Sequence, residues 1–463
     1  MASSIKKIGI IGGGPAGLAT AIQLKKHNFE VLLFEASKHD QITIGEHLAA
    51  EAMHEFKKLG IPNAILKNNS IPCTEVQNAW GDANIHHNES IFNPFGEGFV
   101  LSRPDFDAAL FKYCSEIGID TKLGSRISKI DKTATGWNLH VNNTRTSVDF
   151  IIDASGRNSK FNFDSSLKKE KENQLIGITK QLAPRTKNAI KQRHLLVEST
   201  KNGWWYTVQV DTGMLISTFM TDANLFKAST NSSSDFWNEQ LADSTHTKAR
   251  LNAFDIPQEA FIKSAHSHLA NHVFGDHWLK VGDAAQSFDP LSSAGILKGL
   301  KMGQQAAAAI YKYAHGKADA FKLYANEITS QHQEYTQAKA NYYANETRWM
   351  QHSFWYQRNL KLKNIQHFTI TPISTLKVSP VASTEKLAFL QQQLPAINFK
   401  ILLQCLAQNA LVKDALFAYL QKTNTTKMSP WLLHALESFK IIGLLSTAVK
   451  KVEINERLPV NNP

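Results

Sequence analysis

Hydrophobic residues at the start of the chain fall into two short runs separated by a helix-like pattern. Residues 5–11 form an apolar run rich in isoleucine, which is typical of a buried parallel strand. Residues 16–27 carry apolar side chains at helical spacing, and residues 30–35 form the second run. This order predicts a β-α-β unit, the unit from which a doubly wound α/β fold is built.

The middle of the chain shows two kinds of pattern. Residues 105–117 predict an amphipathic helix, and residues 148–153 predict another buried strand. Residues 176–262 differ, because runs such as 204–210 and 214–220 alternate as antiparallel strands do. We therefore expect a β-rich domain inserted into the α/β fold.

The last part of the chain is predicted to be rich in helix. Strand character returns at residues 278–282, and a long helix is expected at about 294–315. After residue 346 the pattern is mainly helical, and Ser429 followed by Pro430 is a typical helix start. We expect a C-terminal helical region, with docking of a partner protein as an alternative to packing on its own domain.

Composition indicates an ordinary globular protein. At 463 residues, the chain is too long for one compact core and predicts two or three subdomains. The net charge is +11, but the lysines and arginines are spread along the sequence. A solvated basic surface therefore explains the charge better than nucleic-acid binding, and docking to an acidic protein stays open.

Cysteine usage and the N-terminus favour a cytoplasmic protein. The three cysteines form no Cys-x-x-Cys pair and are odd in number, which argues for a reducing compartment. The uncharged run from Ile8 to Leu24 resembles a signal peptide, but Gly12 to Pro15 would break a hydrophobic signal helix. No later uncharged stretch approaches the ~20 apolar residues of a membrane span.

The turn after the first predicted strand has the spacing of a dinucleotide site. In Gly-x-Gly-x-x-Gly, Gly12 permits a tight turn, Gly14 lets a pyrophosphate approach the backbone, and Gly17 allows close packing of helix on strand. Pro15 and Ala16 open the helix, whose free N–H groups attract phosphate. Glu35, at the end of the next strand, is placed to bind the adenosine ribose.

A second element favours FAD over NAD. The strand at 278–282 ends in Gly282-Asp283, and a loop rich in proline, serine and glycine leads into the long helix. Asp283 would face the ribityl hydroxyls, and the helix N-terminus would face the edge of the flavin that gains negative charge on reduction. The residues predicted to lie there are Pro290, Ser293, Ala294, Gly295 and Ile296.

Three further stretches complete a recognisable set of motifs. Ile-Gly-Glu ends at Glu46, Arg-x-x-Phe-Asp starts at Arg103, and Asp-Ala-Ser-Gly-Arg runs from Asp153 through Gly156. With these motifs, residues 5–360 resemble the group A FAD-dependent monooxygenases, in the branch that includes the flavin-dependent tryptophan halogenases. The resemblance implies that Glu46, Arg103, Asp153 and Gly156 also contact the FAD.

Local matches narrow the resemblance. Residues 79–110, 203–206 and 342–356 are similar to the flavoproteins that form tryptophylquinone cofactors in glycine and lysine oxidases. This implies hydroxylation of a tryptophan side chain in the precursor of a quinoprotein oxidase, with consumption of O₂. Because the chain has a single complete Gly-x-Gly-x-x-Gly, the electrons would come from transiently bound NAD(P)H, a reductase, or reduced flavin.

The halogenase alternative lacks two features. Trp204-Trp205-Tyr206 stands where halogenases have Trp-x-Trp-x-Ile-Pro, and Lys67 is the only lysine between residues 60 and 80. Halogenases need a lysine on the path from flavin to substrate, and that position falls nearer Pro72. We therefore expect hydroxylation, with a small-molecule aromatic hydroxylase or halogenase and a non-catalytic FAD-bound assembly factor as the alternatives.

Candidate catalytic and substrate residues follow from these motifs. Glu46 and His47 come directly after a cofactor motif and could accept a proton from the ring being hydroxylated, or serve only as cap or surface residues. Aromatic residues could line a pocket for an indole or fill the core. Strand alternation places Trp204 and Tyr206 on one face and Trp205 on the other. The four predicted pocket residues are Trp80, Trp204, Trp205 and Tyr206.

A histidine cluster before Gly282 is the remaining candidate for a site. His266 and His268 would share a face of a strand, as in some metal sites, but no nearby set of cysteines or carboxylates completes a ligand shell. We predict a surface cluster and no metal. The predicted parts of the chain are an FAD-binding domain (1–75, 100–175 and 262–345), a substrate domain (76–99 and 176–261) and a C-terminal helical region (346–463).

Overall fold

The computed structural model describes two separate units of the chain. The units comprise Met1–Leu360 and Lys361–Pro463. In the first unit the described residues are 5–39, 43–161, 163, 175–186, 192–229 and 231–358. In the second they are 376–378, 398–408, 418–419, 421–423 and 445–447.

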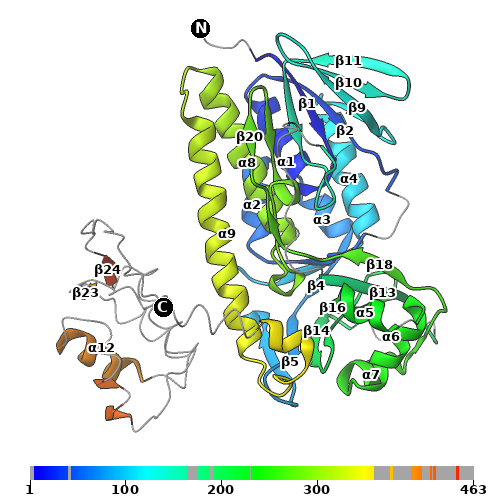
Figure 1. The fold of residues 1–463 in the computed structure, drawn as a ribbon, viewed down its shortest axis with the longest axis vertical. Helices are drawn as coiled ribbons and strands as arrows, with labels where there is room; N and C mark the ends of the chain where they lie inside the picture. The colour runs from blue at the N-terminus through cyan, green and yellow to red at the C-terminus, as the bar shows by residue number, and fades with distance from the viewer. Residues whose placement is uncertain are drawn as a thin grey trace, which may run out of the picture. The chain divides into compact units, whose positions relative to one another are not determined.

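A six-stranded sheet forms the centre of the α/β part (Figure 1). β1 (Lys7–Ile11) pairs in parallel with β2 (Glu30–Phe34) and with β12 (Phe150–Asp153). The full order is β20-β21-β12-β1-β2-β8, with β20 at Phe274–Gly275, β21 at Trp278–Lys280 and β8 at Asp120–Lys122. The first apolar runs are therefore adjacent strands, and the predicted doubly wound α/β fold is confirmed.

Helices pack on this sheet through small residues. α1 (Pro15–Lys26) and α8 (Gly295–Ala314) approach closely, because a Cβ at Gly303 would lie 2.6 Å from the Ala16 carbonyl oxygen. The buried side chains of both helices join those of β1, β2 and β12 in one core. Further helices outside the β-rich part are α2 (Ala52–Leu59), α3 (Asn63–Asn68), α4 (Arg103–Glu116) and α9 (Ala320–Ala344).

An eight-stranded, mostly antiparallel sheet forms the β-rich part. Its path is β17-β13-β16-β15-β14-β5-β6, and β18 also pairs with β13. The strands are β5 (Glu75–Ala79), β6 (His86–Glu89), β13 (Leu175–Pro184), β14 (His194–Thr200), β15 (Gly203–Gln209), β16 (Leu215–Asp222), β17 (Phe254–Asp255) and β18 (Phe261–Ser264). β5 and β6 thus share one sheet with strands that follow them by about a hundred residues or more. The predicted boundaries of the substrate domain stay a prediction.

The central strands β15 and β16 are buried on both faces, which explains their strong hydrophobicity. Trp204 and Tyr206 belong to one core and Trp205 to another, so the predicted alternation is confirmed. Helices α5 (Ala223–Ala228), α6 (Ser233–Ala242) and α7 (His246–Leu251) lie beside this sheet in Figure 1. Side chains of α6 and α7 contribute to the core that contains Trp205.

Short elements complete the first unit. A three-stranded sheet has the order β3-β7-β4 and another the order β11-β10-β9, and β19 pairs with β22. Their bounds are β3 (His47–Leu48), β4 (Ser70–Cys73), β7 (Gly98–Leu101), β9 (Ile127–Lys132), β10 (Trp137–Val141), β11 (Thr144–Val148), β19 (His268–Leu269) and β22 (Gln286–Ser287). Three 3₁₀ helices span η1 (Ser90–Phe92), η2 (Gly282–Ala284) and η3 (Pro290–Ser292).

The described part of the second unit contains one helix and one strand pair. α12 spans Phe399–Gln408, and β23 (Leu376–Val378) pairs with β24 (Leu445–Thr447), which the apolar pattern did not predict. The helix start predicted at Ser429 and Pro430 lies outside the described residues. Among the helices that the structure describes, none has the length and apolar character needed to cross a bilayer. Cys73 and Cys114 are free and buried, and Cys405 is also buried.

Candidate functional site

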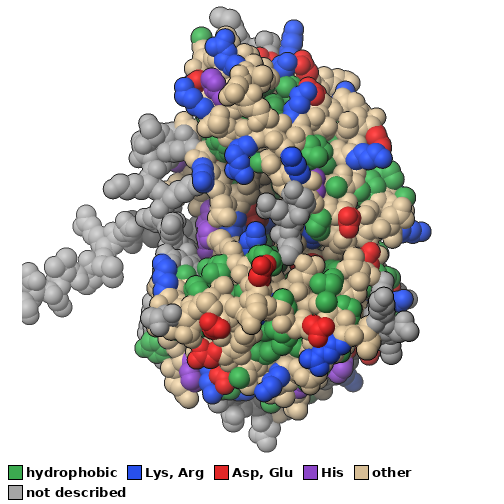
Figure 2. Space-filling model, turned by 90° about the vertical axis from the view of Figure 1, so that its right-hand side faces the viewer, with side chains coloured by type: hydrophobic (Ala, Val, Ile, Leu, Met, Phe, Trp, Pro, Cys, Tyr) green, Lys and Arg blue, Asp and Glu red, His purple; other side chains and the backbone are tan. Residues whose placement is uncertain are grey.

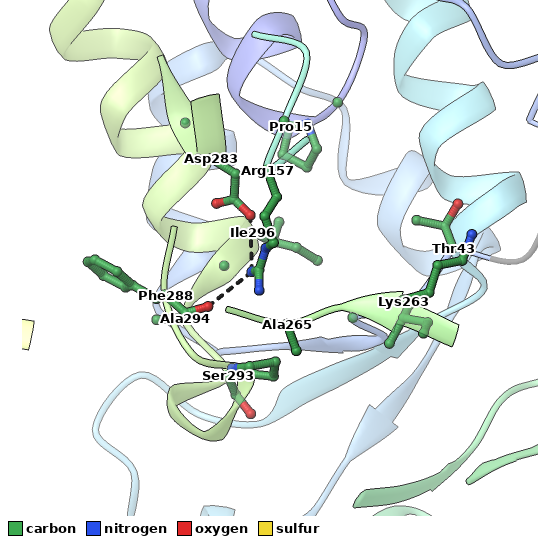
Figure 3. A pocket seen from close by; sticks show the side chains of 18 of the residues that line it. Pro15, Thr43, Arg157, Lys263, Ala265, Asp283, Phe288, Ser293, Ala294 and Ile296 are labelled. Carbon is green, nitrogen blue, oxygen red and sulfur yellow. Dashed lines mark hydrogen bonds and ion pairs between the residues drawn. The ribbon is translucent and has the colours of Figure 1, made fainter. Parts of the chain in front are cut away.

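A cavity of about 480 Å³ lies where β1, α1 and α8 meet the β-rich part (Figure 3). Gly14, Gly156 and Gly295 line it, and a Cβ at any of these glycines would meet nothing within 4 Å. The space beside these glycines is therefore open at the backbone itself. A pyrophosphate needs this kind of access to main-chain N–H groups at a helix N-terminus. We call the three glycines the backbone cradle, and its shape fits FAD.

Gly12 and Gly17 shape the turn from behind and do not line the cavity. Gly12 has φ of 112°, and a Cβ there would lie 2.3 Å from the Ala154 carbonyl oxygen. A Cβ at Gly17 would lie 1.9 Å from the Gly12 carbonyl oxygen. These glycines are required for packing of helix on strand, whereas Gly14 borders free space.

Glu35 stands at the end of β2 next to the same turn. Its carboxylate accepts hydrogen bonds from the backbone N–H of Gly13 at 2.6 Å and of Ser37 at 2.7 Å. The carboxylate thus braces the turn, and its predicted contact with the adenosine ribose stays a prediction.

Asp283 lines the cavity and is held between two cations. Its carboxylate accepts hydrogen bonds from Lys298 Nζ at 2.6 Å and from Arg157 at 3.2 Å. Burial alone would raise the pKa of Asp283, but these two cations outweigh burial and hold the pKa below its usual value. The carboxylate is therefore ionised and oriented. Lys298 was not predicted, although a lysine in the first turn of α8 beside Gly282-Asp283 is a usable sequence signal.

Asp153 corrects one prediction, because its side chain does not reach the cavity. It is fully buried at the end of β12 and accepts hydrogen bonds from Ser155 and from Ser159 Oγ, the latter at 2.6 Å. The side chain thus folds back onto the turn that follows the strand. Asp153 shapes the loop that brings Gly156 to the cavity and does not itself contact a cofactor there.

The loop from η3 into α8 lines the cavity as predicted from its sequence. Ser293 has a positive φ of 49°, and the Asp289 side chain caps the short helix by accepting from the Leu291 N–H at 3.0 Å. This turn presents backbone and small side chains to the cavity. The predicted residues that line it are Pro290, Ser293, Ala294, Gly295 and Ile296, together with Pro15 and Ala16.

Arg103 reaches the cavity from the start of α4. Its guanidinium donates to the carbonyl oxygens of Ile44 at 3.1 Å and of Gly45 at 3.0 Å, and it pairs with Asp107 at 2.8 Å. Gly45 has φ of 103°, so the backbone turns sharply there. Arg103 therefore fixes the loop that carries the two predicted catalytic residues.

Glu46 and His47 play different roles. Glu46 is buried behind the cavity wall, where its Oε2 accepts a hydrogen bond from the Tyr206 hydroxyl at 2.9 Å. Burial raises the pKa of Glu46. His47 lines the cavity, and burial lowers its pKa to about 4, so the ring is neutral near pH 7. Neither His47 Nδ1 nor Glu46 Oε1 has a hydrogen-bond partner among the described residues.

Of the four aromatic residues predicted to line a substrate pocket, one reaches this cavity, and the substrate pocket itself stays a prediction. Tyr206 lines the cavity, whereas Trp80, Trp204 and Trp205 do not. Trp204 donates its indole N–H to the Tyr343 hydroxyl at 3.0 Å and packs edge-on against Trp80 at 6.3 Å. Trp205 packs on the other face against Trp237 at 5.0 Å. These tryptophans fill the core on the two sides of the sheet.

The lysines near the cavity bear on the halogenase alternative. Lys67 is exposed on α3 and does not line the cavity, whereas Lys263 of β18 does. The histidine cluster is engaged locally: His268 Nδ1 lies 2.6 Å from Ser287 Oγ, and the His266 and His268 rings are 5.5 Å apart. Within the described ranges, no group of three or more His, Cys, Asp or Glu is placed to hold a metal ion.

Comparison with known proteins agrees with this geometry. Residues 6–337 match the family described as FAD binding domain. The FAD-dependent oxidoreductase LodB of Marinomonas mediterranea is 29% identical over 366 residues, which cover 77% of this chain and 98% of LodB.

Solved structures show the same fold. QhpG, described as a peptidyl tryptophan dihydroxylase essential for tryptophylquinone cofactor biogenesis, aligns with a TM-score of 0.65 at 21% identity, covering 82% of this chain and 85% of QhpG. The flavin-dependent halogenase CmlS aligns with a TM-score of 0.70 at 18% identity, covering 98% of each chain.

Proposed function

Since the chain belongs to the FAD-binding-domain family and is an FAD-dependent oxidoreductase related to LodB, we propose that it hydroxylates a tryptophan side chain of a precursor protein during formation of a tryptophylquinone cofactor. The observation that carries the proposal is the arrangement of one cavity. A backbone cradle for FAD forms one wall, and His47, whose ring is neutral near pH 7, lies on another.

The backbone cradle and Asp283 would hold the cofactor. Gly14 would admit the pyrophosphate, Asp283 would accept from the ribityl hydroxyls, and the N-terminus of α8 at Gly295 would face the flavin ring. When bound, FAD supplies the electrons and the activated oxygen for insertion into an aromatic ring. The overall reaction consumes O₂ and one two-electron donor such as NAD(P)H. One oxygen atom enters the C–H bond of the indole, and the other leaves as water.

His47 accepts the proton that the ring carbon must lose. Oxygen insertion converts that carbon to a tetrahedral centre, and loss of its proton restores aromaticity. Such a centre is a strong acid, so an imidazole with a pKa of about 4 is basic enough to remove the proton. Burial keeps the ring neutral, and the Arg103-held loop places it in the cavity.

Tyr206 orients the substrate from the β-rich wall. Burial, and then the Glu46 carboxylate, raise the pKa of Tyr206 well above its usual value, so the hydroxyl stays protonated and donates to Glu46. The phenol ring is thereby fixed at the cavity, where an indole can pack against it. Glu46 is a positioning residue in this scheme, because it acts through Tyr206.

The choice of a protein substrate rests on relatedness and on the basic surface. The chain spans nearly all of LodB, and the name of QhpG describes a peptidyl tryptophan as its substrate. The net charge of +11 favours encounter with an acidic precursor, an effect that falls as ionic strength rises.

A co-expression experiment tests the proposal. The chain is produced with a candidate quinoprotein precursor, and intact and peptide mass spectrometry locate added oxygen. We expect one or two added oxygens on a precursor tryptophan, and about 10²-fold slower addition with His47→Gln at equal FAD content. Hydroxylation of free tryptophan without any change in precursors supports the small-molecule alternative. Tight precursor binding with no added oxygen supports the assembly-factor alternative.

Turnover in the presence of a halide distinguishes the halogenase alternative from hydroxylation. With reduced FAD, O₂ and bromide, we expect no brominated tryptophan. A brominated product contradicts hydroxylation, and Lys263 rather than Lys67 is then the first lysine to replace, because Lys263 lines the cavity. Lys67→Met is the matched control, since Lys67 is exposed on α3.

A further inference from the structure

β18 is an edge strand of the eight-stranded sheet. It pairs with β13 on one side, and no described residue pairs with its other side. Ala265 donates its backbone N–H to the Leu175 carbonyl oxygen at 2.9 Å, and antiparallel pairs alternate between bonded and non-bonded positions. The backbone groups of Ile262 and Ser264 therefore point away from β13. An open edge of this kind is a template for another strand.

The open edge is continuous with the cavity. Lys263, Ser264 and Ala265 line the cavity, and Lys263 is paired with Gly177, which also lines it. Figure 3 shows Lys263 and Ala265 at the border of the cavity, across from Ile296 and Arg157. A Cβ at Gly177 would lie 2.9 Å from the Thr218 side chain and 3.2 Å from Met220 Sδ, so these two side chains fill the space beside Gly177.

The edge also presents groups that a partner can bind. Phe261 is 38% exposed and Ile262 is 45% exposed, which are large fractions for such side chains in a sheet. Lys263 is exposed and has no ion pair with any described residue. Figure 2 shows that this face of the molecule is hollowed, with basic, acidic and hydrophobic side chains around the hollow. Exposed apolar side chains beside a cavity are typical of a binding surface.

We propose that an extended segment of the partner protein adds to the open edge of β18 as a further strand and so places its aromatic side chain in the cavity. This inference rests on the proposed function, which requires a protein-bound indole. Main-chain pairing to Ile262 and Ser264 fixes the register, and side chains on the cavity face of the added strand lie beside Phe261 and Lys263. An acidic side chain two residues from the indole would lie on the same face of the added strand and would meet Lys263.

Pairing through the backbone explains how one enzyme holds a segment that is not yet folded. The hydrogen bonds need no particular side chains, so recognition depends on an extended backbone, one aromatic residue and a nearby acid. Alternation of side chains then sends the indole to the cavity face and its immediate neighbours to the other face, where Ile262 lies.

Two changes test the edge by binding, without relying on turnover. In the FAD-loaded full chain, Ile262→Pro removes an outward N–H and leaves the bonds between β13 and β18 in place, because proline is tolerated at such positions of edge strands. Ile262→Val is the matched control. The probe is a short, capped, β-prone peptide with one tryptophan and one aspartate. It is used in three forms. One form is unmodified, and each of the other two carries N-methyl groups on the backbone amides along one of the peptide's two edges.

We expect calorimetry to show that Ile262→Pro binds the unmodified peptide at least about tenfold more weakly, whereas Ile262→Val binds it like the wild type. One of the two N-methylated peptides should bind the wild type like the unmodified peptide, and the other at least about tenfold more weakly. The peptide comparison uses the unaltered protein, so it stands even where the proline variant does not fold.

Several results would overturn the proposal. Equal binding of both N-methylated peptides would do so, as would absence of saturable binding to the wild type at about 1 mM peptide. A wild-type dimer that dissociates in Ile262→Pro would show that a second copy occupies the edge. Oxidation of a precursor that is unaffected by both changes would reject the edge and leave the proposed function standing. Binding that depends on the edge, without oxidation of the precursor, would support the edge and reject the proposed function.

Discussion

The two walls of the cavity are built on different principles. On the FAD-binding wall the main chain forms the surface, and Gly14, Gly156 and Gly295 contribute by having no side chain. On the β-rich wall the surface consists of side chains, and Tyr206 is held in place by buried Glu46. A side chain added to a wall made of backbone would occupy the space that the cofactor needs. A wall made of side chains tolerates changes that preserve shape, because neighbouring contacts can adjust.

The largest expected effect comes from filling the backbone cradle. Gly14→Val should abolish FAD binding, because the added side chain would occupy the space for the pyrophosphate. Gly14 has φ of −76°, which any residue adopts, so the change introduces no backbone strain. Equilibrium binding of FAD to apoprotein measures the effect, with Gly14→Ala as the graded control and circular dichroism to verify folding. FAD affinity equal to wild type would remove Gly14 from the site.

The next largest effect tests the side-chain wall. His47→Gln should lower turnover by about 10²-fold, the usual contribution of a positioned base, with FAD binding nearly unchanged. Trp205→Phe is the control for general packing damage, because Trp205 is buried in the eight-stranded sheet and does not line the cavity. Rapid-mix kinetics of oxygen transfer to the precursor measure both variants. Equal losses in the two variants would indicate packing damage and not loss of a base.

A smaller effect on FAD affinity is expected from Asp283, a charged side chain that lines the cavity. Asp283→Asn should weaken FAD binding by about tenfold or more, because a hydrogen bond from a ribityl hydroxyl to a charged acceptor is lost. Lys298 would then lack its buried counter-ion, since its side chain is 6% exposed. The double change Asp283→Asn with Lys298→Met separates these causes. Recovery of full FAD affinity in the double variant would show that Asp283 acts only by neutralising Lys298.

The smallest effect is a dependence of stability on pH. The folded protein holds His47 at a pKa of about 4, below the ordinary value near 6.5, so the unfolded chain binds more protons between these values. Stability contributed by neutral His47 is therefore complete above pH 6.5 and is lost as pH falls toward 4. Between pH 6.5 and 5, His47→Gln should lose about 1–2 kcal/mol less stability than wild type in urea unfolding. Equal losses of stability in wild type and His47→Gln would indicate that the His47 ring is exposed to solvent.

The same contrast explains what could be predicted from sequence. The turn at Gly12 to Gly17 and the Gly282-Asp283 element depend on local backbone geometry, and the structure brings Gly14 and Asp283 to one cavity. The aromatic residues depend on pairings of distant segments. Trp80 meets Trp204 only because β5 joins β14 across more than a hundred residues, and no local pattern encodes that contact. Asp153 is held inward by Ser155, which belongs to the quoted motif, and by Ser159, which lies beyond it, and the motif alone does not show that both serines donate to this carboxylate.

The most direct test of the account is a structure of the chain with FAD bound. We predict that the pyrophosphate lies on the N–H groups at Gly14 and the start of α1, and that the flavin ring and the side chains of His47 and Tyr206 face the same space. An aromatic side chain could then lie between them within about 4 Å of both. A flavin that fills the space between Tyr206 and His47, or a pyrophosphate bound away from Gly14, would contradict the account.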